Sequence, residues 1–226
     1  SNTKELCKET GEDYLKDWWQ NKDVTITNFI GKDNIIFHAI IFPTMSLASG
    51  RARAVDELPA NQYVNLEGKQ FSKSKGWYID ADKAVKEFGP DNLRYYLTTL
   101  IPETTDSSFT WKGFEAKING ELANNIGNFI NRSLSFFWKN WKEGIEGEKF
   151  QNFFETDDHK EVIGLIKDYH QAMDKFQIKR GLETIMHIGQ KANGFFSERA
   201  PWAQIKEDEE ACKETIAHSA IYAFYL

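Results

Sequence analysis

Residues 65–76 read NLEGKQFSKSKG and hold three lysines, two serines and two glycines around one phenylalanine. Glycine and lysine at this density are typical of a solvated hairpin tip, where they provide turn geometry and solubility. A second interpretation starts from Ser72 and Ser74, which bracket Lys73 and bring two hydroxyls and an ammonium close together. Lysine is a mobile point charge that suits a polyphosphate, and the N–H groups of a glycine turn add donors. The segment is therefore either a solvated turn or a phosphate-binding loop.

The residues before this segment predict a mixed α/β region. Residues 24–30 (VTITNFI) alternate and are β-branched, which predicts a strand, and after Gly31 an apolar helical pattern runs from about residue 34 to 49. Residues 62–66 and 69–72 predict a short hairpin around Glu67 and Gly68.

The residues after the segment predict helices. Residues 80–100 indicate two helices broken at Gly89-Pro90, with Asp80 and Asp91 as N-caps. From Trp111 onward the pattern is almost wholly helical, with expected helices at 111–142, 157–176, 178–198 and 208–225. We expect a mixed α/β part followed by an all-α bundle, with the change near residues 103–111.

Composition limits the function classes. The chain has 226 residues, 41% of them hydrophobic and 14% aromatic, which is enough for a sizeable core. A net charge of −6 argues against a generally basic nucleic-acid coat, so any contact with a polyanion must be local. Cys7 and Cys212 are too far apart in sequence for a metal knuckle and are expected to be reduced thiols. No apolar run reaches the ~18 residues of a spanning helix and no signal peptide is recognisable, so we expect no membrane association and a cytoplasmic location.

Two common nucleotide-binding motifs, GxxxxGK[ST] and GxGxxG, do not occur. Instead, residues 70–74 (QFSKS) resemble the second signature of class I aminoacyl-tRNA synthetases, usually written KMSKS. Their neighbours resemble methionyl-tRNA synthetases: NFIGKDNIIFHAIIFPTM at 28–45, GPDNLRYYL at 89–97 and APW at 200–202. The resemblance runs through almost the whole chain in order and spacing.

The resemblance implies an organisation in three parts. Residues 1–66 would be the second half of a Rossmann-like nucleotide-binding domain, residues 67–110 the signature loop with the stem-contact region, and residues 111–226 an antiparallel anticodon-binding bundle, truncated at its C-terminus. No HxGH motif, the first signature of the class, occurs in the chain. That motif and the zinc-bearing insertion of the family would lie upstream, so we expect a piece of a longer polypeptide with no metal site of its own.

The resemblance also assigns catalytic roles. Lys73 would stabilise the pyrophosphate of ATP, bound with Mg²⁺, while methionine attacks the α-phosphate, and Ser72 and Ser74 would assist. This agrees with the general chemistry of such transfers, which depends on positioning and charge stabilisation. The first lysine of the signature is Gln70 here, with Lys69 one position earlier. The first ammonium is therefore either lost or supplied by Lys69.

Further assignments concern ATP and methionine. By resemblance Gly31 and Asp33 would hold the ribose, Val64 would meet the adenine through its backbone, and Phe37 and His38 would border the methionine side chain. From the residues alone, Asp33 can also be a helix N-cap near residue 34, His38 a satisfied core histidine and Val64 an ordinary strand residue.

The helical part carries a second set of candidates. Asn124, Asn128 and Arg132 are spaced i, i+4 and i+8 along one expected helix. They form either a solvent face or a reader of unpaired bases, whose edges suit Asn and Arg. Trp202 follows Pro201, a helix-start pattern, and is either a core indole or a stacking platform. The resemblance implies that these four residues bind the CAU anticodon of tRNA(Met).

The resemblance thus implies part of an enzyme that makes methionyl-adenylate from methionine and ATP and then esterifies tRNA(Met). One alternative is a stand-alone tRNA-binding module in which the signature loop is a relic. Another is a class I ligase for leucine, valine, isoleucine or cysteine, although GKDNIIFH and APW favour methionine.

Overall fold

The structure is a computed structural model that describes residues 2–226. The chain forms two compact units. Unit 1 holds residues 2–64 and 102–107, and unit 2 holds residues 65–101 and 108–226. The three-part division at residues 66/67 and 110/111 stays a prediction.

Unit 1 contains a parallel strand pair with helices between its strands. Strand β1 (Ile30–Gly31) pairs in parallel with β2 (Ala60–Asn61), and a bridge between Thr27 and Glu57 continues the pairing toward the N-terminus. The connection from β1 to β2 includes the 3₁₀-helix η2 (Lys32–Asn34), the π-helix η3 (Phe37–Ile41) and α2 (Phe42–Ser49). Helix α1 (Asn2–Thr10) and the π-helix η1 (Tyr14–Trp19) precede them. A strand–helix–strand crossover is therefore present, as expected of an α/β region.

The predicted elements of unit 1 are largely confirmed. The helix expected over residues 34–49 is present, and it ends at Gly50, whose φ of 62° is a left-handed value that favours glycine. The strand expected over 24–30 is shorter, because regular pairing is limited to Ile30–Gly31 and the bridge at Thr27.

Unit 2 begins with a small α/β portion. Strands β3 (Val64–Leu66) and β4 (Ser107–Phe109), each of which has its first residue in unit 1, form a two-stranded sheet. Helices α3 (Ala81–Phe88) and α4 (Pro90–Thr99) follow the signature segment and are broken at Gly89-Pro90 as predicted.

One of the two predicted caps is confirmed and the other is wrong. Asp80 caps α3, since its Oδ1 accepts the backbone N–H of Lys83 at 3.0 Å. Asp91 does not cap α4, because that helix begins one residue earlier at Pro90, with Gly89 (φ 81°) at the N-cap. Proline is preorganised for the first helical position, so Asp91 falls inside the first turn.

A long continuous helical segment precedes the other helices of the bundle. It consists of α5 (Trp111–Lys117), the π-helix η4 (Ile118–Gly127) and α6 (Asn128–Asn140), close to the single helix expected over 111–142. The remaining helices are α7 (Gly147–Gln151), the 3₁₀-helix η5 (Asn152–Glu155), α8 (Asp157–Asp174), α9 (Ile178–Arg199), α10 (Pro201–Glu207) and α11 (Glu209–Tyr225).

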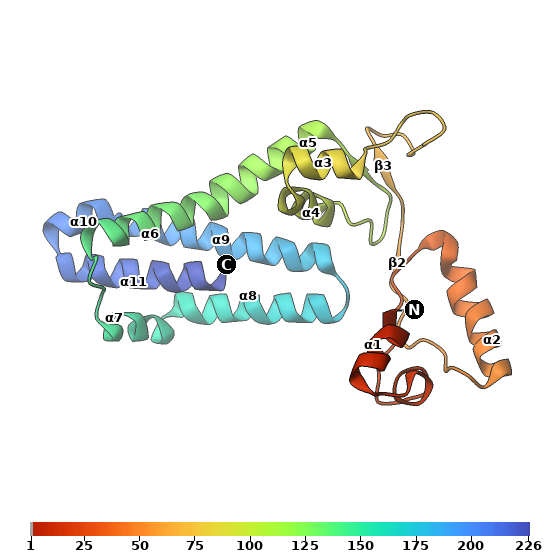
Figure 1. The fold of residues 1–226 in the computed structure, drawn as a ribbon. Helices are drawn as coiled ribbons and strands as arrows, with labels where there is room; N and C mark the ends of the chain where they lie inside the picture. The colour runs from red at the N-terminus through yellow and green to blue at the C-terminus, as the bar shows by residue number, and fades with distance from the viewer. Residues whose placement is uncertain (1) are drawn as a thin grey trace. The chain divides into compact units, whose positions relative to one another are not determined.

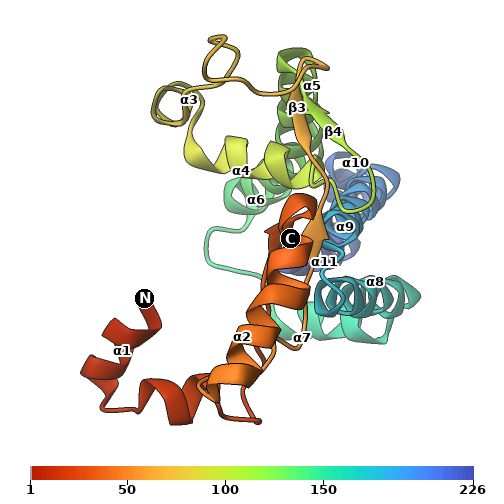
Figure 2. The ribbon, with the colours of Figure 1, turned by 90° about the vertical axis from the view of Figure 1, so that its right-hand side faces the viewer.

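The core of unit 2 lies among α6, α8, α9 and α11. Figures 1 and 2 show α9 beside both α8 and α11, and α11 also packs on α6. Fully buried side chains between these helices include Phe129, Val162, Ile188, Ile216 and Tyr222. This core holds in place the helix faces that carry the candidate residues on α6 and α10.

Cys7 and Cys212 are buried and free.

Among residues 2–226, no helix combines the length and the apolarity needed to cross a membrane.

Candidate functional site

The signature loop, residues 69–77, is closed by two pairs of backbone hydrogen bonds. Leu66 and Lys69 exchange hydrogen bonds of 2.7 and 2.9 Å around Glu67 and Gly68. These two turn residues have φ of 49° and 75°, as a two-residue type I′ hairpin requires. The predicted hairpin is therefore present at this turn.

Further along, Ser72 and Trp77 exchange backbone hydrogen bonds of 2.8 and 2.9 Å. Inside this closure the N–H of Gly76 donates to the carbonyl of Lys73 at 3.1 Å, with Gly76 at φ 65°. The tip of the loop is thus a short closed turn that a residue with a Cβ would strain at position 76.

Three of the four residues predicted for catalysis lie at this tip, and the fourth, Lys69, lies at the base of the loop. The hydroxyls of Ser72 and Ser74 lie 3.3 Å apart on either side of Lys73 in the sequence. The side chain of Lys73 is exposed, and within residues 2–226 its ammonium has no hydrogen-bond or ion-pair partner. Chemically, the tip presents the ammonium of Lys73, two hydroxyls and the further exposed cation of Lys75, a set that can bind phosphate oxygens.

Trp77 ties the loop to the hairpin below it. Its indole N–H donates to the carbonyl of Leu66 at 3.1 Å. The ammonium of Lys69 lies over the same indole, 5.4 Å from the ring centroid. Lys69 is therefore held at the base of the loop beside Gln70, and whether it replaces the first signature lysine stays a prediction. Sequence reasoning did not single out Trp77.

In unit 1, Gly31 and Asp33 are in close contact. A Cβ added to Gly31 would lie 2.8 Å from Oδ1 of Asp33, so the carboxylate lies close to the glycine, and a larger residue at position 31 would require the Asp33 side chain to turn aside. Asp33 is not an N-cap, because it lies within η2 (Lys32–Asn34) and Gly31 holds the cap position. The carboxylate is exposed, and its Oδ1 accepts a long hydrogen bond of 3.5 Å from the side-chain amide of Asn34.

Sequence reasoning missed the charged group next to this site. Nζ of Lys32 donates to Asp106 at 3.0 Å and lies 4.4 Å from the ring centroid of Tyr63. The same carboxylate accepts the backbone N–H of Tyr63, and this bond together with Lys32 lowers the pKa of Asp106 below its usual value of 3.8. These contacts connect η2 to the residues before β3, and nothing in local sequence pattern indicates them.

Phe37 and His38 stand on the π-helix η3. Phe37 is exposed, while His38 is half-buried. Nδ1 of His38 lies 3.1 Å from the side-chain amide nitrogen of Asn28, which can donate a hydrogen bond to it. His38 is thus a satisfied histidine that is not fully buried, and Asn28 is its unpredicted partner. Val64 is half-buried at the start of β3.

In unit 2, the structure brings Arg132 and Trp202 together although they are 70 positions apart in the numbering. The guanidinium carbon of Arg132 lies 5.0 Å from the ring centroid of Phe196 and 5.6 Å from that of Trp202. Trp202 lies in the first turn of α10, directly after Pro201, and remains 48% exposed. The indole is therefore not a core residue, and a cation is fixed against it.

Asn124 and Asn128 are exposed, but they do not continue a regular α-helical row. Asn124 lies in the π-helix η4, whose hydrogen bonds run i to i+5, and Asn128 starts α6. The four-residue spacing between them therefore does not align their side chains as it would in an α-helix.

An unpredicted amide network anchors this π-helix to α9. The side chain of Asn125 donates to the carbonyl of Met186 at 3.0 Å. The amide of Asn193 donates to the side-chain and backbone oxygens of Asn125 at 3.0 and 2.8 Å. At Gly189 an added Cβ would meet Oδ1 of Asn125 at 3.0 Å, so the glycine allows this close approach. The local sequence does not distinguish Asn125 from Asn124, because both lie in the same polar run. The role of Asn125 depends on its contacts with α9, which are distant in the sequence.

Comparisons with known protein families match both parts of the chain. A family model described as "tRNA synthetases class I (M)" matches residues 1–134, and one described as "Anticodon binding domain of methionyl tRNA ligase" matches residues 148–223. The first range includes the signature loop and Arg132, and the second includes Trp202.

Individual relatives agree. A methionine–tRNA ligase of Protochlamydia amoebophila is 38% identical over 92% of this chain and 30% of its own length. A methionine–tRNA ligase of Methanopyrus kandleri is 35% identical over 95% of this chain and 31% of its own length. The chain thus spans about a third of the length of these relatives.

Solved structures show the same likeness. A Mycobacterium tuberculosis methionyl-tRNA synthetase in complex with methionyl-adenylate matches with a TM-score of 0.72 and 28% identity, over 87% of this chain and 38% of that one. A second structure of the M. tuberculosis enzyme, bound by methionyl-adenylate, matches with a TM-score of 0.76 and 25% identity over 95% of this chain and 41% of that one. Because the class I (M) family model matches more than half of its residues, the chain belongs to the class I (M) tRNA synthetase family.

Proposed function

We propose that this chain is the part of a methionine–tRNA ligase that carries the second signature loop and reads the anticodon. The longer protein would activate methionine with MgATP to give methionyl-adenylate and then transfer methionine to tRNA(Met) in the cytoplasm. The family match, the names of the relatives and the methionyl-adenylate bound in two similar structures support this proposal.

In the proposed activation step, Lys73 binds the β- and γ-phosphates and stabilises the negative charge that develops as pyrophosphate leaves. An ammonium with no other partner can follow that charge, and the hydroxyls of Ser72 and Ser74 can hold the phosphate oxygens. The Mg²⁺ that accompanies ATP would bridge its phosphates as part of the substrate.

In unit 1, the proposed ligands are the ribose, the adenine and methionine. The exposed carboxylate of Asp33, close to Gly31, can accept both ribose hydroxyls, and the backbone of Val64 would meet the adenine. Phe37 offers an exposed ring for the methionine side chain, and the imidazole of His38 offers one polar contact.

In the helical part, Arg132 and Trp202 would receive the anticodon CAU, with Asn124 and Asn128 reading base edges. The observation that carries this proposal is the fixed cation over a half-exposed indole. A base can stack on that indole while the guanidinium contacts a base edge or a phosphate. Trp202 on α10 lies within the residues matched by the anticodon-binding family model, which supports the assignment, while Arg132 on α6 lies within the match to the class I (M) model.

The experiment uses Lys73→Ala in the protein extended to the length of its relatives. We expect adenylate formation, measured by ATP–pyrophosphate exchange, to slow by about a hundredfold with little change in methionine affinity, because the ammonium acts on charge in the transition state. Lys75→Ala is the matched control: it removes the same charge from the same loop and should have a much smaller effect. An effect of Lys73→Ala confined to methionine affinity, or equal to that of Lys75→Ala, would show that Lys73 has been misassigned.

A further inference from the structure

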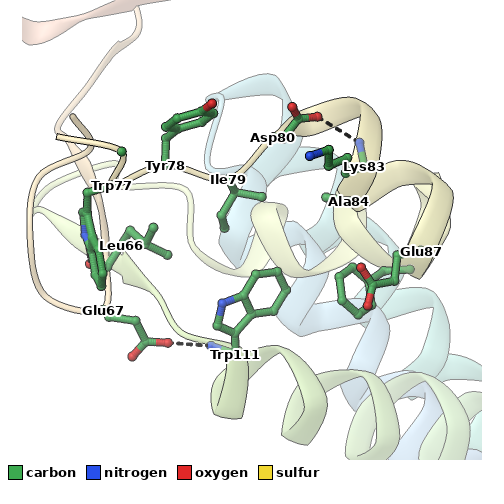
Figure 3. A pocket seen from close by; sticks show the side chains of 12 residues that line it. Leu66, Glu67, Trp77, Tyr78, Ile79, Asp80, Lys83, Ala84, Glu87 and Trp111 are labelled. Atoms are coloured by element: carbon green, nitrogen blue, oxygen red, sulfur yellow. Dashed lines mark hydrogen bonds between the residues drawn. The ribbon is translucent and has the colours of Figure 1, made fainter. Parts of the chain in front are cut away.

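A pocket in unit 2 lies behind the signature loop and belongs to none of the sites described above. Its volume is about 420 Å³, within the range of small-molecule sites. Gly76 and Trp77 of the loop form part of its wall, and the rest comes from the hairpin, the start of α5 and helix α3. Figure 3 shows these side chains from close by.

Large aromatic rings dominate the lining. Trp77, Tyr78 and Trp111 line this pocket and are 37%, 48% and 41% exposed. In Figure 3 the indoles of Trp77 and Trp111 stand on either side of Leu66. Exposed aromatic rings that gather around one hollow offer flat apolar surface and the negative faces of their π-systems.

Charged groups on the rim are mostly acidic. Glu67, Asp80 and Glu87 line the pocket together with a single cation, Lys83. Glu67 accepts the backbone N–H of Trp111 at 2.9 Å, and Asp80 accepts that of Lys83. The carboxylate of Glu87 has no hydrogen-bond or ion-pair partner among residues 2–226.

We propose that this pocket binds a small organic cation, namely a primary ammonium carried on a flat apolar body. The aromatic walls would hold the body, and the ammonium would lie at Glu87 and over an indole face. The excess of carboxylates disfavours phosphate-bearing ligands, so the pocket is distinct from the ATP and tRNA sites of the proposed function.

Occupancy of the pocket would reach the signature loop through Trp77. This residue forms part of the pocket wall, is paired through its backbone with Ser72, and holds the Lys69 ammonium on its ring. The apolar body of a bound ligand would pack against Trp77 and so change the environment of the indole that holds Lys69 and of the loop amides. The pocket is thus a site from which a metabolite can influence the loop without touching ATP.

Three ligands with the same indole body test the charge requirement: tryptamine (cation), tryptophol (neutral) and indole-3-acetate (anion). Each is titrated into the isotope-labelled 226-residue chain, and the indole N–H and backbone amide signals are followed by NMR. We expect tryptamine to shift the Trp77 and Trp111 indole signals and the amides of residues 72–77, and to bind about three- to tenfold more tightly than tryptophol, with indole-3-acetate weakest. Equal binding of the three ligands, binding of none, or shifts confined to other residues would overturn the proposal.

Paired variants locate the cation. Glu87→Gln should reduce tryptamine affinity to that of tryptophol, whereas Asp82→Asn, on the same helix but outside the lining, should leave it unchanged. Both variants keep side-chain size, so folding is preserved and can be checked in the same spectra. Equal affinities of the two variants for tryptamine would contradict the assignment of the ammonium to Glu87.

Discussion

Replacing Trp202 by alanine separates a base-stacking platform from a structural indole. The side chain is 48% exposed and contacts the Phe196 ring, with centroids 6.1 Å apart, and the Arg132 guanidinium. Truncating a fully buried aromatic residue costs about 3–5 kcal/mol, so a half-exposed one should cost about 2 kcal/mol. Arg132 keeps Phe196 as its second aromatic partner, and the chain should stay folded.

The effect of Trp202→Ala on the free energy of RNA binding is separate from its effect on the free energy of unfolding. Loss of one stacked base is worth about 1–3 kcal/mol, which corresponds to a roughly 5- to 150-fold weaker complex with a CAU stem-loop. Fluorescence anisotropy with labelled stem-loops measures the affinity, and urea denaturation of the same samples measures stability. Trp202→Phe keeps a ring for stacking and should bind within about threefold of wild type.

The outcome that would refute this reasoning is specific. If Trp202→Ala loses the 3–5 kcal/mol typical of a core residue, or weakens CAU and changed anticodons by the same factor, then the indole does not read the anticodon.

Two further predictions concern Lys69 and His218. If Lys69 supplies the ammonium missing at Gln70, Lys69→Ala should slow adenylate formation in the extended protein, and Gln70→Lys should be neutral or mildly activating. Unchanged kinetic constants in Lys69→Ala would show that Lys69 does not replace the missing lysine. His218 is buried against Phe153 and Phe195, and burial lowers its pKa below the usual 6.5 despite Glu214 at 3.8 Å. The unfolded chain then binds more protons below about pH 6.5, so stability should fall as the pH drops from about 7.5 to 5. In His218→Leu, the free energy of unfolding measured by urea denaturation should change less between about pH 7.5 and 5 than in the wild type. The same pH dependence in the variant and the wild type would contradict this prediction.

Local signals in the sequence were sufficient for most elements of the fold. Asp80 before an amphipathic pattern fixes the start of α3, and Gly89-Pro90 breaks the chain into two helices. Pro201 likewise predicts the start of α10, where Trp202 is found. In each case the cause lies within a few residues, as with N-caps and the fixed φ of proline.

Nonlocal pairing is where the sequence was insufficient. Strand β2 (Ala60–Asn61) has no alternating apolar pattern, and it becomes a strand only because Ile30 and Gly31 pair with it. The π-helix η4 cannot be read from periodicity, since its stabilising contacts come from Asn193 on α9.

The candidate site likewise has a part that local sequence predicts and a part that depends on nonlocal packing. The residues of the signature loop are contiguous, so their convergence at the tip could be predicted. The arrangement of Arg132 between Phe196 and Trp202 depends on the packing of α6 against α9 and on the turn into α10. The pocket behind the loop combines residues from three separate segments of the chain, and no local pattern in the sequence indicates it.

The central claim is that the helical part of this chain reads a CAU anticodon, and binding of stem-loops to the wild-type 226-residue chain tests it most directly. A CAU stem-loop and one with a changed anticodon differ only in the three bases, so contacts with phosphates contribute equally to both. We expect the CAU stem-loop to bind at least about tenfold more tightly, since a mismatched base contact costs about 1–3 kcal/mol. Equal affinities for the two stem-loops, measured on chain that is folded by circular dichroism, would contradict the account.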